Sequence, residues 1–558
     1  MIKPADWIKS IKVSEDVRDM YGDAKSWKTY FDYFCNNMNT SNILTYNILY
    51  AMGKVLTVKS YFTNPSVTVR PALQHTASPE AFIFARIIEA IDNWLLSDVM
   101  KVKKQIKRIC LDAYLYGTGI GKLGYDSEYG YTSDTADSNI QDATLTQFNK
   151  GTGDKIEYNT TIIPGMPWMK RVNPKDILFA WDATDIDDCS WIANRIVRHI
   201  DDVKADVKLT NTEALKPNVK FDNDKEVNIK TLKDYIEMWE IRDCKTGRMY
   251  ILTEGSDKFL YNEVDVLQNK GLPYEVVTFN DIGDSIWGVP DCKILMPQQN
   301  EINEARTQAM LHRRLAIVKI LAEAGSISPE QKLELLSDKP MAIVDVIGNP
   351  NSCIREFSVN IPGDLVNWVE SIRQDTREII GLSRVQLGEL EAGGRKTAYE
   401  VGQVAAASEL RISERADAVS DFLKGVINKV NDIIFRLWQT DRTIGIIGND
   451  NIKYWLNYKG TELQGDYVID VNVEEKRPDT VALRKQEAME LYTVMMKDPE
   501  LSPETRQRLR SNLILQYGSI PKDILDATTA QGESPISLNQ FIKTQMPMQQ
   551  EQMQRGAV

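Results

Sequence analysis

The stretch "ISERADAVSDFLKGVINKVNDIIFRL", residues 412–437, is the longest periodic segment of the chain. Its apolar residues recur at alternating spacings of four and three, which places them along one face of an α-helix. With the residues before it, the stretch predicts a continuous helix of around 40 residues, roughly 60 Å long. We interpret it as a central core helix rather than a free coiled coil. The apolar face consists of Ile412, Ala416, Val419, Leu423, Val426, Val430, Ile433 and Leu437.

Two polar segments before this helix predict a stalk. Residues 298–314, "QQNEINEARTQAMLHRR", and residues 362–380, "PGDLVNWVESIRQDTREII", each predict a helix of roughly 25–30 Å. A helix that is polar nearly all round bridges solvent or packs in an assembly. Between them, residues 318–360 predict a small unit with a helix at "SPEQKLELLS", a strand at "KPMAIVDV" and a turn at "IGNPNS". The two helices around this unit form an out-and-back stalk, and a glycine-rich loop follows.

Composition limits the class of protein. The 558 residues are enough for several domains, and 42 % apolar with 26 % charged residues is typical of a soluble globular protein. The 67 basic and 79 acidic residues give a net charge of −12, which argues against a simple nucleic-acid coat with a basic face. It does not argue against a protein that lets DNA slide past, because only tight binding needs many Lys or Arg contacts with phosphate.

The sequence gives little support for a metal site, a reactive or disulfide-bonded cysteine, or a membrane-spanning helix. His75, His199 and His312 are too far apart to predict a metal site, and we expect no metal and no cofactor. The six cysteines show no CxxC spacing and are interpreted as small buried apolar residues in a reducing compartment. The N-terminus lacks an apolar signal segment, and no run of roughly 18 apolar residues predicts a membrane-spanning helix. The cysteines are Cys35, Cys110, Cys189, Cys244, Cys292 and Cys353.

The stretch "LYGTGIGKLGY", residues 115–125, raises the question of a phosphate-binding loop. The P-loop pattern needs a glycine where this chain has Tyr116, and a Ser or Thr for Mg²⁺ where it has Leu123. The preceding residues 98–116 have helical spacing, whereas a P-loop follows a strand. We therefore interpret the stretch as a glycine-rich helix stop that leads into a strand.

The remaining segments predict a mixed α/β chain. Helices are expected over residues 1–60 and 79–97, and a basic helix follows with Lys101, Lys103, Lys104, Lys107 and Arg108 on its wet face. Paired strands are expected at "DYIEMWEIRD" and "RMYILTEG", with "CKTG" as the turn. Residues 126–160 predict a long surface loop, and the acidic turn at Asp182, Asp185, Asp187 and Asp188 lacks the glycine and glutamate of an EF-hand. Strands are expected over residues 451–474, helices from about residue 478, and a Gln/Met-rich tail at the end.

Four phrases, in this order, resemble the portal proteins (head–tail connectors) of tailed bacteriophages. "RICLDAYLYGTGIGKLGYD" resembles the family's helix–glycine–strand step, and "WMKRVNPKDILFAWDA" resembles a following strand. "IWGVPDCKILMPQQNEINEARTQAM" resembles the entry into the first stem helix. "IIGLSRVQLGELEAGGRKTAYEV" resembles the second stem end, the tunnel loop and the start of the long wing helix. The ordered set covers roughly residues 80–480.

The resemblance implies a helix-rich mixed α/β portal fold with an α/β wing, a two-helix stem, a small α/β clip, a long wing helix and a helical crown. The wing with the N-terminal region would occupy residues 1–290. The stem helices would occupy residues 291–318 and 361–382, with the clip at 319–360 between them. The tunnel loop would be 383–395, the long helix with the remaining wing 396–475, and the crown with a flexible tail 476–558.

The resemblance also implies a function. Such proteins form a homo-oligomeric ring, typically a dodecamer, at one capsid vertex, through which double-stranded DNA is packaged and ejected. They are not enzymes. A large terminase subunit docks at the clip, head–tail adaptor and tail proteins later replace it, and major capsid and scaffold proteins surround the ring. The implied location is the portal vertex of the virion, and the host cytoplasm during assembly, with no membrane partner.

Candidate site residues follow from these assignments. We expect the tunnel loop to contact DNA through Arg384, Gln386, Glu389, Glu391, Arg395 and Lys396. Candidates for the stem lumen are Glu301, Glu304, Glu370, Arg373 and Arg377. Candidates for docking at the clip are Glu330, Lys332, Glu334, Asp338 and Lys339.

Two other classes of function remain open on the sequence. Another virion structural or scaffold protein would use the long helix for assembly, and would be a monomer or filament rather than a closed ring. A nucleotide hydrolase would use Gly117–Lys122, and purified protein would then turn over ATP.

Overall fold

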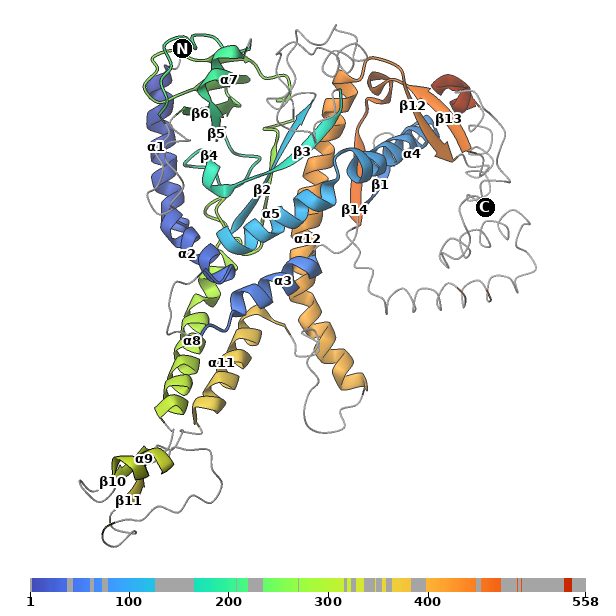
Figure 1. Cartoon of the computed structure of the whole chain (residues 1–558). Coiled ribbons are helices and arrows are strands. Elements are labelled where there is room, and N and C mark those ends of the chain that lie inside the picture. The colour runs from blue at the N-terminus through green and yellow to red at the C-terminus, as the bar shows by residue number, and fades with distance from the viewer. Residues whose placement is uncertain are drawn as a thin grey trace. The chain divides into compact units, whose positions relative to one another are not determined.

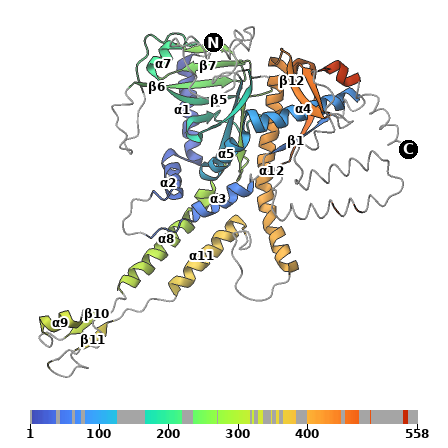
Figure 2. The same ribbon diagram turned by 45° about the vertical axis from the view of Figure 1, so that its right-hand side comes forward.

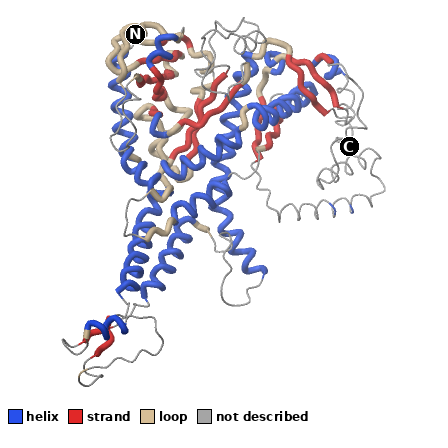
Figure 3. The backbone as a smooth tube through the Cα atoms, viewed as in Figure 1, coloured by secondary structure: helices blue, strands red, loops and turns tan. Residues whose placement is uncertain are grey.

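The computed structural model divides the chain into two compact units, which are described separately. Unit 1 comprises Met1–Trp27, Val55–Asp291 and Ile412–Val558, and unit 2 comprises Lys28–Lys54 and Cys292–Arg411. Helices and strands alternate along the chain, so the fold is mixed helix and sheet (Figure 3). The described residues are 3–37, 44–60, 65–72, 79–125, 165–206, 208–218, 234–268, 270–315, 319–322, 328–335, 347, 354–357, 364–382, 398–447, 453–472, 489, 493 and 536–543.

A three-stranded antiparallel sheet with the order β3–β2–β9 lies at the centre of unit 1 (Figure 1). Ile120 of the middle strand is opposite Val172 on one side and Val276 on the other. Helix α5 comes directly before β2 and ends at Gly117, whose φ of 91° is a conformation that glycine adopts without strain. The predicted helix–glycine–strand step is confirmed. The elements are α5 (Val102–Tyr116), β2 (Thr118–Tyr125), β3 (Pro167–Val172) and β9 (Tyr274–Thr278).

Helix α12 (Ala398–Leu437) confirms the predicted helix of about 40 residues. Within unit 1 its residues Val419, Leu423, Val426, Val430 and Ile433 are buried in the main hydrophobic cluster, so the core-helix interpretation is correct. The cluster also takes in residues of α4 (Pro79–Trp94), the π-helix η2 (Leu95–Val99), β1 (Ser66–Pro71), β12 (Arg442–Ile447), β13 (Lys453–Tyr458) and β14 (Tyr467–Asn472). β1 pairs with β14, and β12 pairs with β13, to which the short β15 (Ile536–Ser537) adds a parallel strand.

A five-stranded antiparallel sheet in unit 1 has the order β4–β5–β6–β7–β8. The predicted hairpin is confirmed, since Asp243 and Arg248 are opposite each other and Gly247 adopts a φ of 62° in the turn. Apolar residues from β6, β7 and α7 form a second cluster under this sheet. The elements are β4 (Ile177–Phe179), β5 (Trp191–His199), α7 (Ile200–Ala205), β6 (Tyr235–Asp243), β7 (Arg248–Leu252) and β8 (Tyr261–Val264).

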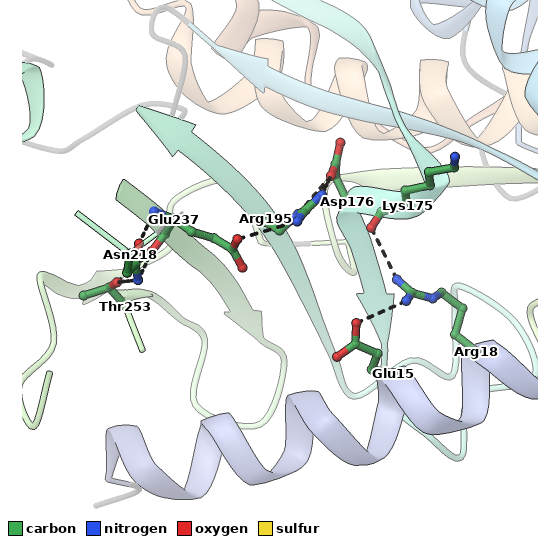
Figure 4. A network of polar contacts seen from close by, with 8 residues as sticks. All are labelled: Glu15, Arg18, Lys175, Asp176, Arg195, Asn218, Glu237 and Thr253. Carbon is green, nitrogen blue, oxygen red and sulfur yellow. Dashed lines mark hydrogen bonds and ion pairs between the residues drawn. The ribbon is translucent and has the colours of Figure 1, made fainter. Parts of the chain in front are cut away.

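The N-terminal helix α1 (Pro4–Tyr21) is held beside this sheet by polar contacts (Figure 4). Arg18, only 5 % exposed, donates to the carbonyl oxygen of Lys175 at 3.3 Å and to Glu15 at 3.3 Å. On the sheet itself, Arg195 pairs with Asp176 at 2.6 Å. Figure 4 continues this network through Glu237, Asn218 and Thr253.

Unit 2 contains the two predicted stalk helices. Helix α8 (Asp291–Leu315) and helix α11 (Asp364–Ile380) lie side by side in Figures 1 and 2. Between them in the chain, β10 (Lys319–Ala322) pairs antiparallel with β11 (Ile354–Phe357), and α9 (Pro329–Leu335) is the predicted helix of the small unit. Residues 339–346, predicted as a strand, lie outside the described residues. α2 (Ala24–Phe34) and α3 (Ile48–Ser60), with α1, confirm the predicted helical N-terminal region.

Two predictions need correction or stay open. Cys110, Cys189 and Cys292 are buried as expected, but Cys35 and Cys244 are exposed, because each follows the end of an element at the surface. The loop predicted over residues 126–160, the helices expected from residue 478 and the tail lie outside the described residues, apart from short pieces such as β15. No helix in the described part of the chain is long and apolar enough to cross a membrane.

Candidate functional site

The candidate site is the pair of helices α8 and α11 in unit 2. Ile302 of α8, Ile372 of α11 and Ile48 of α3 are buried together, each at most 3 % exposed. The Nε1 of Trp368 donates a hydrogen bond to Glu301 across the two helices at 2.8 Å. A narrow apolar contact therefore holds the helices together. Most of their exposed residues are polar, and the large apolar residues among the exposed ones are Ile294, Leu311, Trp368 and Ile379.

A stripe of polar side chains on α8 is buried inside unit 2. Gln299, 1 % exposed, accepts hydrogen bonds from the backbone N–H groups of Ile48 at 2.8 Å and Leu49 at 3.2 Å. Ile48 and Leu49 are the first residues of α3, so Gln299 acts as a cap of that helix, and the N–H of Ile48 also donates to the carbonyl oxygen of Tyr46 at 2.9 Å. The Nε2 of Gln299 donates to the carbonyl oxygen of Tyr46 at 2.8 Å and to Asn303 at 3.0 Å.

Asn303 and Thr307 continue the same stripe at spacings of four. Asn303, 6 % exposed, accepts from the backbone N–H of Tyr46 at 2.9 Å, and Thr307 accepts from that of Leu44 at 3.1 Å. From its sequence, the polar surface of α8 is expected to face solvent or to pack in an assembly. For this stripe that interpretation is wrong, because the polar groups satisfy the backbone of residues 44–49 of the same chain.

The charges on α11 are partly paired within the helix. Glu370 forms ion pairs with Arg373 at 3.1 Å and with Arg377 at 3.2 Å. The arginines stand three and seven residues after the glutamate, so the three side chains lie along one face. The helix ends where the carbonyl oxygen of Arg377 accepts from the N–H groups of Gly381 at 2.7 Å and Leu382 at 3.0 Å, with Gly381 at a φ of 78°.

The structure places all five predicted stem residues on these two helices. Glu301, Glu304 and Glu370 are exposed, Arg373 is half-buried, and Arg377 is 5 % exposed. Glu304 accepts from Gln308 of the same helix at 3.2 Å. The five residues thus form separate local contacts, with Glu370, Arg373 and Arg377 brought together and Glu301 joined to Trp368. Sequence reasoning missed Gln299 and Asn303, because a buried polar stripe has the same helical spacing as an exposed one.

The other predicted site residues are only partly described. On α9, Glu330 and Lys332 are exposed and Glu334 lies in the helix. Asp338 and Lys339 lie outside the described residues. So do the tunnel-loop candidates Arg384, Gln386, Glu389, Glu391, Arg395 and Lys396.

The glycine-rich stretch 117–122 has a packing role in unit 1. A Cβ on Gly119 would overlap the backbone carbonyl of Ile109 in α5, and one on Gly121 would lie 2.8 Å from the ring of Phe422 in α12. The Nζ of Lys122 is buried and bonded to Glu240 of β6 at 2.6 Å. Burial lowers the pKa of Lys122, and Glu240 opposes that shift. In addition, the glycine-rich stretch here follows a helix and leads into a strand, whereas a P-loop follows a strand and leads into a helix.

The buried charges around Lys122 extend across the five-stranded sheet. Glu240 also accepts from Arg242 at 3.0 Å, and Arg242 pairs with Asp265 at 2.5 Å. All four side chains are at most 8 % exposed, and opposite charges alternate along the chain of contacts. Such a network fixes the three-stranded sheet β3–β2–β9 against the five-stranded sheet, because removal of one member would leave a buried charge without compensation.

No group of three or more His, Cys, Asp or Glu side chains that could hold a metal ion occurs among the described residues. The acidic turn that contains Asp182, Asp185, Asp187 and Asp188, which we expected to be solvated, has hydrogen bonds between its own residues. Asp188 accepts from the backbone N–H of Asp185 at 3.0 Å and from the hydroxyl of Thr184 at 2.6 Å. These hydrogen bonds lower the pKa of Asp188.

No protein-family model matches the chain, and no curated protein matches it.

Proposed function

We propose that the chain is the subunit of a phage portal ring, which forms the channel for double-stranded DNA during packaging and ejection. The observation that carries the proposal is the out-and-back pair α8 and α11 around a small α/β unit, followed by the long helix α12. The antiparallel pair β10–β11 places Lys319 opposite Phe357, so α8 ends and α11 begins at the same end of the stalk. This order of parts is the order that the portal resemblance implies.

The exposed faces of the stalk helices support a place in a ring. Gln308 of α8 and Ser371, Gln374, Asp375 and Glu378 of α11 are exposed. Polar faces of this kind suit helices whose flanks meet neighbouring copies and whose inner side faces water.

The charge of the stalk supports passage of DNA rather than tight binding. Helix α11 carries four acids (Asp364, Glu370, Asp375 and Glu378) and two arginines, a net charge of 2 − 4 = −2. Both arginines contact Glu370, so phosphate would have to compete for them. Since affinity for DNA grows with the number of Lys and Arg contacts to phosphate, such a wall repeated around a ring binds DNA weakly.

In this proposal the chain itself does no nucleotide chemistry. A large terminase subunit, docked on the unit that contains α9, would hydrolyse ATP during packaging, and adaptor and tail proteins would take its place afterwards. Glu330 and Lys332, exposed on α9, are available for such a partner.

Negative-stain microscopy with mass measurement on the purified chain tests the proposal. We expect closed rings with an axial hole and a mass near twelve times that of one chain, because a head-to-tail contact that closes produces a ring. A filament, or a monomer even after addition of capsid and scaffold proteins, would contradict the portal assignment and favour another virion structural protein.

Replacement of residues 383–395 by a short Gly/Ser linker tests the proposed tunnel loop. The variant should still form rings, because the loop lies between α11 and α12 and outside both. Packaging of DNA into capsids, or its retention afterwards, should fall. Unchanged packaging and retention would show that the segment is only a connection between helices.

A further inference from the structure

A hollow at the start of α5 in unit 1 is lined by four lysines. The hollow has a volume of about 390 Å³, and we call it the lysine pocket. Its lining residues are Lys101, Lys103, Lys104 and Lys107, with Pro65, Leu96 and Ser97. Three of the lysines are exposed and Lys103 is half-buried. None of the four forms an ion pair with another described residue, and the nearby Asp98 accepts a hydrogen bond from Ser97 at 2.7 Å.

The positive charges around the lysine pocket are electrostatically unfavourable in an isolated chain. The N-terminal end of a helix carries partial positive charge, and α5 has no acidic residue in its first turn. Lys103 and Lys107 are four residues apart and Lys104 and Lys107 three apart, so like charges lie next to each other on the helix surface. Negative charge from another molecule would relieve both effects.

A second hollow in unit 1 has the opposite charge. We call it the carboxylate pocket; its volume is about 640 Å³ and it lies beside β9 and α12. Its ionisable lining residues are Asp185, Asp187, Glu275, Asp281, Asp421, Lys270 and Lys429, a net charge of 2 − 5 = −3.

One of the two cations of the carboxylate pocket is already engaged within the chain. Lys429 pairs with Glu275 at 2.7 Å and donates to the carbonyl oxygen of Tyr274 at 2.8 Å. Asp185 and Asp187 are exposed at the rim. The pocket therefore presents carboxylates to whatever approaches it, and a cationic surface is the complement that would fit.

The two pockets lie toward opposite edges of the same sheet. In the order β3–β2–β9, the η2 segment next to the lysine pocket contacts β3, whereas four residues of β9 line the carboxylate pocket. Surfaces of opposite charge at two separate places on one unit allow copies to join head to tail. A head-to-tail contact that closes on itself generates a ring.

We propose that the lysine pocket of one copy docks on the carboxylate pocket of the next copy. This inference rests on the proposed ring and names the residues of one contact in it. The cations of the lysine pocket meet Asp185 and Asp187 at the rim of the neighbour, and each copy uses both surfaces once. Nucleic acid is the other polyanion that a lysine pocket could meet, and the test separates the two.

Charge reversal tests the contact on the full chain. In Lys104→Glu/Lys107→Glu, and separately in Asp185→Lys/Asp187→Lys, like charges would face each other, so the concentration needed for ring formation should rise at least about tenfold. The chain that carries all four substitutions has the charges exchanged, and rings should return. Lys204→Glu/Lys208→Glu, which changes two exposed lysines outside both pockets by the same charge, is the matched control.

Mass photometry and negative-stain microscopy at fixed salt give the readout, and circular dichroism confirms that each variant is folded. Rings in every variant would overturn the contact and leave the portal proposal intact. No rings from the wild-type chain would contradict the portal proposal itself. Normal rings with reduced DNA binding in the lysine variant would assign the lysine pocket to nucleic acid and also overturn the contact.

Discussion

Asp291 and Arg415 form a two-pronged ion pair that joins the first residue of α8 to α12. The Nη1–Oδ2 distance is 2.8 Å and the Nη2–Oδ1 distance is 2.7 Å. Asp291 is 3 % exposed and Arg415 9 % exposed, and the arginine also lies over the ring of Phe279 at 5.0 Å. The pair thus holds Asp291 against α12 within unit 1.

Asp291→Ala should lower the free energy of unfolding by about 3–5 kcal/mol, because it leaves the Arg415 guanidinium buried without its carboxylate. Urea denaturation of the purified chain measures the change. Asp441→Ala, which removes an exposed partner of Lys459 at 3.9 Å, is the control and should cost at most about 1 kcal/mol. Equal effects of the two substitutions would show that the buried pair does not stabilise unit 1.

Gly119 and Gly121 should differ in their tolerance of alanine. Both glycines of β2 face a helix. A Cβ on Gly119 would meet the backbone carbonyl of Ile109, whereas a Cβ on Gly121 would meet the end of the Phe422 side chain. Gly119→Ala should therefore destabilise more than Gly121→Ala, whose cost we expect in the range of about 1–3 kcal/mol for overpacking.

The second site Phe422→Leu distinguishes the two cases. It removes the ring atoms that a Cβ on Gly121 would meet, so it should partly rescue Gly121→Ala and leave Gly119→Ala unimproved. Thermal denaturation of the single and double variants measures the coupling. If ATP hydrolysis, rather than stability, were the property lost in these variants, the phosphate-loop interpretation would have to be reopened.

Gln299→Ala should weaken the attachment of α3 to α8. The substitution removes the buried side-chain oxygen that accepts from the N–H groups of Ile48 and Leu49, and the amide that donates to Tyr46, which costs about 1–3 kcal/mol. Hydrogen exchange at residues 44–52 should become faster. Gln308→Ala, on the exposed face of the same helix, is the matched control and should change stability by less than about 0.5 kcal/mol. Similar exchange in both variants would contradict the capping role of Gln299.

Asp92 should make stability fall as pH rises. Burial raises the pKa of this carboxyl to about 8, and only one of its oxygens has a described partner, Asn431 at 3.1 Å. An aspartate in the unfolded chain titrates near pH 3.9, so between about pH 4 and pH 8 the folded state holds one more proton than the unfolded state. Stability should therefore decrease by up to about 1.4 kcal/mol per pH unit in that window and level off above it.

Asp92→Asn removes this titration and keeps an oxygen for Asn431. The variant should match the wild type near pH 4 and become progressively more stable than it toward pH 8. Chemical denaturation at several pH values gives the difference. A difference that stays constant with pH would mean that Asp92 does not hold a proton in the folded state.

The elements whose signals are local could be predicted from the order of residues. The spacing of apolar residues from Ile412 to Leu437 predicted α12 and its buried face, since a helix brings residues three and four apart to one side. Gly117 marked the end of α5 and Gly247 the hairpin turn, because both adopt a positive φ. The polar composition of residues 298–314 and 362–380 located the stalk helices, though not which of their polar groups are buried.

Contacts between residues far apart in the chain became known from the folded structure. Gln299 meets Ile48 across 251 positions and Lys122 meets Glu240 across 118, distances that no spacing rule connects. The same holds for the order β3–β2–β9, which places the lysine and carboxylate pockets toward opposite edges. A polar residue on a helix has one sequence pattern whether it faces water, a backbone N–H or a neighbouring copy, because its surroundings are set by what packs against it.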